Sequence, residues 1–92
     1  LSRKEKRAVE SSLLIKVDNL AKELEVSLNL PSTKMIKVHV LDQENEEVKQ
    51  MTDSWTWPGE KKFNWKFGEE VSGAYRLKVE VGELVMLRDI KL

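Results

Sequence analysis

Apolar and polar side chains alternate along most of this chain, and this alternation constrains the fold more than any other feature. The clearest stretch contains Leu24, Val26, Leu28 and Leu30, which are separated by single polar residues. A period of two places the apolar side chains on one face of an extended strand, whereas a helix requires a period near 3.6. The sequence therefore predicts half-buried β-strands.

Turn-forming residues divide the alternating pattern into about seven short strands. Asp18-Asn19, Pro31-Ser32, Ser72-Gly73 and Gly82-Glu83 are typical of turns. The strands that we expect span residues 13–17, 24–30, 36–41, 48–51, 63–67, 75–81 and 84–92. Short strands with one apolar face each indicate an antiparallel sandwich or a small barrel.

A core this small depends on its aromatic residues. Phe63, Trp65 and Tyr75 fall on the apolar positions of expected strands. Each aromatic side chain can bury about 150 to 250 Å². We therefore expect these three rings to face the core, with Trp65 among its central members.

The last expected strand, 84–92, is less regular than the others. Val85 and Leu87 fall on one face, while further apolar residues fall on the other. Either a bulge near Arg88-Asp89 or burial of both faces explains such a pattern. The sequence leaves both explanations open.

The N-terminal segment differs in composition from the rest of the chain. Residues 1–12, LSRKEKRAVESS, are rich in charge, and we expect a linker or short charged tail before a domain that spans 13–92. Ser2 and Glu5 match a capping box, which is compatible with a short helical turn. A basic arm that docks a partner is the alternative. Because the chain starts with Leu1 rather than Met, we expect a piece of a longer protein.

Composition excludes several functional classes. Sixteen Lys and Arg balance sixteen Asp and Glu, so bulk positive charge for nucleic-acid binding is absent. There is no Cys, and the single His39 excludes a site with several histidines. Neither a glycine-rich phosphate loop nor a nucleophile elbow occurs, and no apolar run is long enough to span a membrane. We expect no enzyme activity, no cofactor and no metal.

A series of short motifs runs from Leu24 to Leu92. In chain order the motifs are Leu24 to Leu30 followed by Pro31; Val38 and Val40 before Asp42, Asn45 and Val48; Pro58 and Gly59 before Phe63 and Trp65; Ser72, Gly73 and Tyr75; and Arg88, Ile90 and Leu92. This order resembles the C-terminal domains of type IX secretion cargo, of the sorting type called type A. It is also similar to the Ig-like domain of the flagellar hook-cap scaffold protein.

The motif around Asp42 carries a physical expectation of its own. Asn45 stands where the family has a glycine in a hairpin, and asparagine is the best substitute for glycine at positive φ. Asp42 is expected to cap the amides of the same turn. Gly73 and Gly82 stand at strand reversals, where backbone freedom is needed.

The resemblance implies an all-β fold, an Ig-like antiparallel β-sandwich of about seven strands with a short N-terminal charged tail. It implies a non-catalytic C-terminal sorting or attachment domain that presents a folded signal to the type IX secretion translocon. The resemblance also implies a bacterial parent protein that passes from the periplasm to the cell surface or is secreted. Its partner would be a protein of the secretion or assembly machinery. The alternatives are a structural or assembly module of a secretion or surface machine, and a carbohydrate-binding module.

Two groups of residues are candidates for partner binding. Trp55 and Trp57 could stack on a sugar or pack into a partner. The small core favours another interpretation, in which one or both close the open end of the sandwich. The other candidates lie on the last hairpin, which could recognise a partner through an exposed face or edge; they are Tyr75, Arg76, Lys78, Arg88 and Lys91.

Two further features are expected to be structural. The acidic cluster of Asp42, Glu44, Glu46 and Glu47 lacks the length and glycine of a calcium loop, so we expect a solvated turn. His39 has no second histidine or cysteine nearby in sequence, and we expect a surface histidine on a polar strand face.

Overall fold

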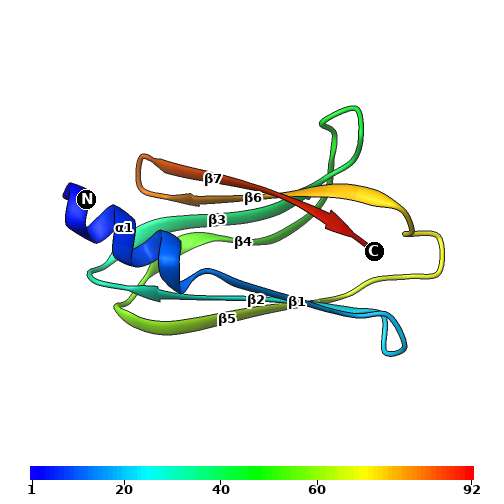
Figure 1. The fold of residues 1–92 in the computed structure, drawn as a ribbon, viewed down its shortest axis with the longest axis horizontal. Coiled ribbons are helices and arrows are strands. Elements are labelled where there is room, and N and C mark those ends of the chain that lie inside the picture. The colour runs from blue at the N-terminus through cyan, green and yellow to red at the C-terminus, as the bar shows by residue number, and fades with distance from the viewer.

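Two antiparallel sheets form the protein in a computed structural model that describes all of residues 1–92. One sheet has the strand order β1-β2-β5, and the other has the order β4-β3-β6-β7 (Figure 1). The elements are α1 (Arg3–Ser12), β1 (Leu14–Asp18), β2 (Glu23–Leu30), β3 (Lys34–Leu41), β4 (Glu47–Thr56), β5 (Gly59–Lys66), β6 (Ala74–Val81) and β7 (Leu84–Lys91). The predicted all-β antiparallel sandwich of about seven strands is confirmed.

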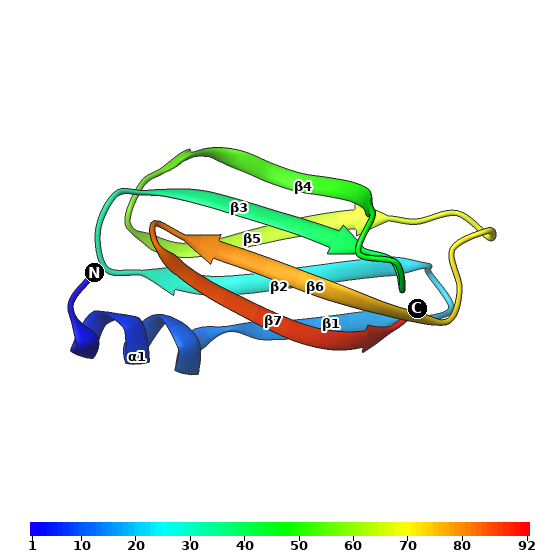
Figure 2. The ribbon, with the colours of Figure 1, turned by 90° about the horizontal axis from the view of Figure 1, so that it is seen from above.

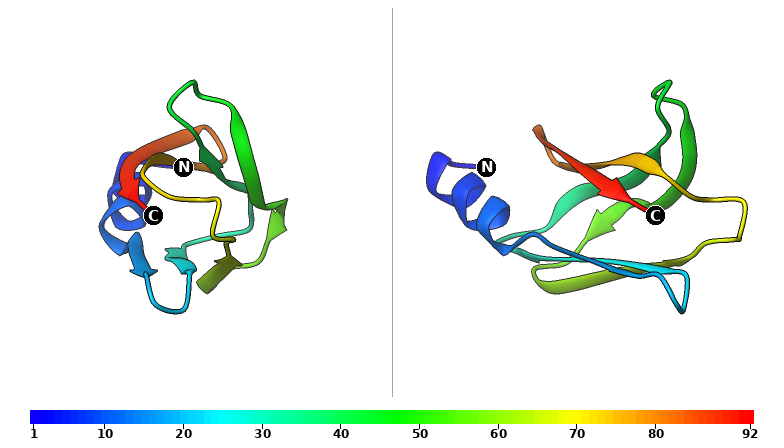
Figure 3. Two further views of the ribbon diagram at one scale, coloured as in Figure 1. Left: turned by 90° about the vertical axis from the view of Figure 1, so that its right-hand side faces the viewer. Right: turned by 45° about the vertical axis from the view of Figure 1, so that its right-hand side comes forward.

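The apolar positions of the strands meet in a single layer between the two sheets, which lie on opposite sides of the domain when seen from its end (Figure 3). Leu24, Val26, Ile36 and Val38 belong to the central strands β2 and β3, and their side chains are fully buried. Trp65 is half-buried and packs against this core, as do Phe63 and Tyr75. The expectation that the three rings face the core is confirmed. Trp65 is not a central member of the core, however, because it stays partly exposed, and Phe67 is the buried aromatic residue.

The N-terminal segment, expected to be a linker or tail, forms helix α1. The predicted capping box is present, because the Ser2 hydroxyl accepts a hydrogen bond from the Glu5 N–H and the Glu5 carboxylate accepts one from the Ser2 N–H. This bond from the Ser2 backbone lowers the pKa of the Glu5 carboxyl. Val9 on the same helix is fully buried in the core. The segment is thus a packed part of the domain, at the end where β2 passes into β3 (Figure 2).

The turn between β3 and β4 is built as the sequence predicts. Asn45 has a positive φ of 63°. One Asp42 carboxylate oxygen accepts hydrogen bonds from the N–H groups of Glu44 and Glu46, each at 2.9 Å. Gly73 also has a positive φ, of 102°, before β6. These residues fix two of the strand reversals through local backbone chemistry.

Strand β4 is longer than the sequence pattern indicates. The alternation predicts a strand over 48–51 only, yet β4 runs from Glu47 to Thr56 opposite β3. Its register shifts twice, and the shifts leave Val48 and Met51 without a partner on β3. Each extra residue reverses the apparent alternation, which explains why the pattern conceals this strand.

Strand β7 shows neither a bulge near Arg88-Asp89 nor burial on both faces. It pairs with β6 in unbroken register from Leu84 to Lys91. Met86 is buried on the inner face, while the Val85 and Leu87 side chains on the outer face are 50% and 47% exposed. The irregular pattern arises because apolar residues occupy solvent-facing positions.

Helix α1 has only ten residues, and the protein contains no helix that could span a bilayer.

Candidate functional site

The outer face of the four-stranded sheet gathers polar residues from strands that are distant in sequence. His39 of β3 lies opposite Gln50 of β4 and opposite Lys78 of β6. In a neighbouring row, Lys37 of β3 lies opposite both Asp53 and Glu80. Charges of opposite sign therefore face each other across the strands, an arrangement that stabilises a solvated sheet face.

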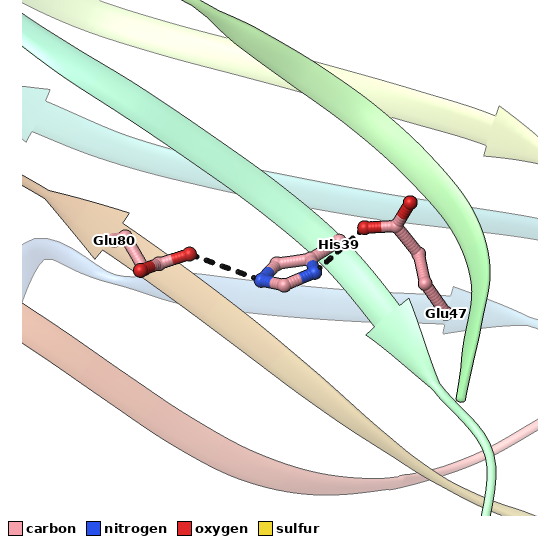
Figure 4. Close-up of polar contacts among 3 residues, drawn as sticks. All are labelled: His39, Glu47 and Glu80. Carbon is pink, nitrogen blue, oxygen red and sulfur yellow. Dashed lines mark hydrogen bonds and ion pairs between the residues drawn. The ribbon is translucent and has the colours of Figure 1, made fainter. Parts of the chain in front are cut away.

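His39 is the one buried polar residue of the protein, with 6% of its surface exposed. Its Nδ1 lies 2.9 Å from Glu47 Oε1, and its Nε2 lies 3.1 Å from Glu80 Oε2 (Figure 4). The prediction of a surface histidine is wrong, although the residue does lie on the outer, polar face of its strand. The flanking carboxylates come from strands on both sides of β3.

The chemistry of these contacts defines the protonation state that they require. A carboxylate only accepts hydrogen bonds, and a neutral imidazole has only one N–H group. Both contacts of His39 are therefore hydrogen bonds only when the ring carries two protons. In that state the imidazolium ties β4 and β6 to the central strand β3 through two charge-assisted bonds.

The acidic turn beside this histidine is largely solvated, as predicted. Glu44 and Glu46 are exposed, and Asp42 holds the turn through its backbone contacts. Glu47 differs, because its carboxylate reaches His39. No group of three or more His, Cys, Asp or Glu residues is arranged to hold a metal ion.

Trp55 and Trp57 lie at one edge of the four-stranded sheet and are 70% and 75% exposed. Trp55 belongs to the edge strand β4 and lies opposite Met35, which is also exposed. The interpretation that these indoles close the end of the sandwich is wrong. Helix α1, rather than either tryptophan, contributes a core residue, Val9, at the end of the sandwich where β2 passes into β3.

The remaining predicted residues lie on the hairpin of β6 and β7. Tyr75 packs against the core. Arg76, Arg88 and Lys91 are exposed, and Lys78 is half-buried on the outer face. Because the strand order is β4-β3-β6-β7, this hairpin and the two tryptophans occupy opposite sides of the sheet. The structure therefore does not unite the predicted residues in a single site.

Sequence reasoning missed the carboxylates around His39 and the exposed apolar residues of β7. Glu80 is 41 positions from His39, so no local pattern could reveal their contact. Val85 and Leu87 were detectable in principle, since strict alternation around Met86 places both on the outer face.

Comparison with models of protein families found no match for the chain, and comparison with curated proteins found no match either.

A double-mutant cycle measures the contribution of the histidine contacts. We expect His39→Ala and Glu80→Ala to couple by about 1 kcal/mol in urea unfolding, because the two side chains lie 3.1 Å apart across β3 and β6. The exposed Arg76–Asp89 pair, 3.4 Å apart, is the control and should couple by less than about 0.5 kcal/mol. Equal coupling in the two pairs would show that His39 does not join the strands.

Proposed function

We propose that this chain is a non-catalytic recognition domain, and that its role is C-terminal sorting or attachment through the type IX secretion translocon. The observation that carries the proposal is the hairpin of β6 and β7. It lies at the side of the four-stranded sheet, and its strand β7 is an edge strand with exposed basic and apolar residues. In the resembled family, the closing strand likewise carries a basic residue and an apolar finish.

The positions of the motifs support this proposal. Asp42 and Asn45 form the β3–β4 turn, Gly73 precedes β6, and Trp65 packs against the core. These four residues have local structural roles that are compatible with the family pattern. The motifs alone are compatible with other Ig-like modules, so the sorting role needs a cellular test.

The distribution of charge also favours the hairpin as the recognition element. The hairpin carries four basic and three acidic residues, and two of the acidic side chains are engaged within the protein: Glu80 contacts His39, and Asp89 Oδ1 lies 3.4 Å from Arg76 Nε. Basic residues around an exposed apolar pair favour a protein partner with acidic groups. The four basic residues are Arg76, Lys78, Arg88 and Lys91.

A reporter fusion tests the sorting role. We expect residues 1–92, fused to the C-terminus of a periplasmic reporter, to bring that reporter to the surface or medium of a host with type IX secretion. Charge reversal by Arg88→Glu with Lys91→Glu should reduce export, because it removes the complementary charge. Lys16→Glu with Lys62→Glu is the matched control, since both lysines are exposed on the other sheet. A folded fusion that stays in the periplasm contradicts the proposal.

The exposure of the two tryptophans favours a second candidate function, carbohydrate binding. Exposed indoles are suited to stacking on sugar rings, and Trp55 and Trp57 lie close together in sequence at a sheet edge.

A glycan array tests this second candidate. We expect binding to a saccharide that is lost in the Trp55→Ala, Trp57→Ala double variant, because the stacking surface is removed. Leu14→Ala with Leu20→Ala provides the control, as both leucines are exposed apolar residues elsewhere. The candidate is eliminated by an array without binding, or by binding that ignores the tryptophan substitutions.

A further inference from the structure

Strand β7 is the most regular free edge of the four-stranded sheet. It has eight residues and keeps one register along β6. The opposite edge, β4, is interrupted by two register shifts, a common way of protecting an edge from pairing. In the other sheet, the edge strand β1 has only five residues. The second edge of that sheet, β5, is as long and as regular as β7, but its outer face carries only polar residues, two of them lysines, which protect an edge from pairing. Regular length and register make β7 suitable for pairing with an additional strand.

The hydrogen bonds at the end of β7 identify which backbone groups face its free edge. Gly73 and Leu92 exchange two bonds, of 3.0 and 2.9 Å. In an antiparallel ladder, such hydrogen-bonded pairs alternate with pairs whose N–H and C=O groups point away. Since the register is unbroken, the alternate residues direct their backbone groups to the free edge. These residues are Val85, Leu87, Asp89 and Lys91.

A side-chain contact supports this assignment independently. The Arg88 Nη1 donates a hydrogen bond to the Leu87 carbonyl oxygen at 2.8 Å. This contact is expected if the Leu87 carbonyl points away from β6, because the carbonyl then has no backbone N–H to accept from. The Arg88 guanidinium thus occupies the place that the N–H of a neighbouring strand would take.

The side chains beside this edge define what a pairing strand must carry. Val85 and Leu87 are two residues apart on the outer face, each about half exposed. An added strand would cover them with its own side chains at alternate positions. Arg88 and Lys91 are exposed and carry positive charge near the other end of β7.

We propose that β7 binds an extended segment of a partner protein as an antiparallel fifth strand of this sheet. The segment carries apolar residues opposite Val85 and Leu87 and acidic residues opposite Arg88 and Lys91. On binding, the Arg88 guanidinium exchanges the Leu87 carbonyl for a carboxylate, and the carbonyl then accepts a backbone N–H. This inference deepens the proposed recognition by the last hairpin and rests on that function.

A designed peptide tests the inference without a secretion host. The capped peptide Glu-Thr-Thr-Glu-Val-Thr-Val matches β7 in antiparallel order and is titrated into the isotope-labelled chain of residues 1–92. In the free protein, the edge-facing amides of Val85, Leu87 and Asp89 should exchange with solvent faster than those of Met86 and its hydrogen-bonded neighbours. Bound peptide should slow the edge-facing amides by about tenfold or more. The peptide with Lys in place of both Glu residues should bind more weakly.

Substitutions on β7 distinguish edge pairing from other binding. Leu87→Ser should weaken peptide binding by about tenfold or more, because the covered apolar surface is lost and no charge is added. Val85→Ser provides a second variant with the same expected effect. Leu14→Ser is the matched control, since Leu14 is 51% exposed on the other sheet and Leu87 is 47% exposed.

Three outcomes would overturn the inference: no binding at millimolar peptide, slowed exchange on another strand, or a concentration-dependent dimer through β7, which would make a second copy of the chain the occupant.

The outcome of the peptide experiment can be distinguished from the outcome of the export experiment. Peptide binding together with a reporter that is not exported would remove only the sorting role. Export without peptide binding would remove only the strand-pairing mode.

Discussion

The packing of apolar side chains between the two sheets holds this protein together. Each sheet contributes fully buried residues from its central strands, among them Val26 of β2 and Val79 of β6. A chain of this length buries only about 60 to 65% of the surface that its unfolded form exposes, so every core contribution matters. Helix α1 adds Val9 to the same layer, which makes the N-terminal segment part of the core.

Because the inner faces of both sheets form the core, only the outer faces and the sheet edges can bind a partner. The three-stranded sheet presents a polar outer surface along β2 and β5, where Glu23 lies opposite Lys66 and Glu25 opposite Asn64. The four-stranded sheet is different, because it combines a charged centre around His39 with exposed apolar residues at both sides. Its two sides therefore supply the surfaces for both candidate functions.

Alternation and turn chemistry allowed much of the fold to be predicted from sequence. The positive φ of Asn45 follows from local backbone sterics, and the inward position of Trp65 follows from strand parity. The length of β4 could not be predicted, because its two register shifts depend on pairing with β3. The contact between His39 and Glu80 could not be predicted either, because only the tertiary fold brings together two residues that are 41 positions apart.

The candidate site was less accessible to sequence reasoning than the fold. A tryptophan in a small protein can belong either to the core or to a binding surface. For Trp55, the pairing of β4 with β3 decides between the two, because it places the indole beside the exposed Met35. For β7, both explanations drawn from the sequence assume that all of its apolar residues are buried. Strict alternation around Met86 instead places Val85 and Leu87 on the solvent-exposed face, as the structure shows.

Native-state hydrogen exchange most directly tests whether one apolar layer unites both sheets. We expect the amides of β2, in one sheet, and of β3 and β6, in the other, to open with the same free energy, equal to that of global unfolding. A much lower opening free energy for β2 than for β3 would contradict it, because the sheets would then unfold independently and the layer between them would not hold the domain together.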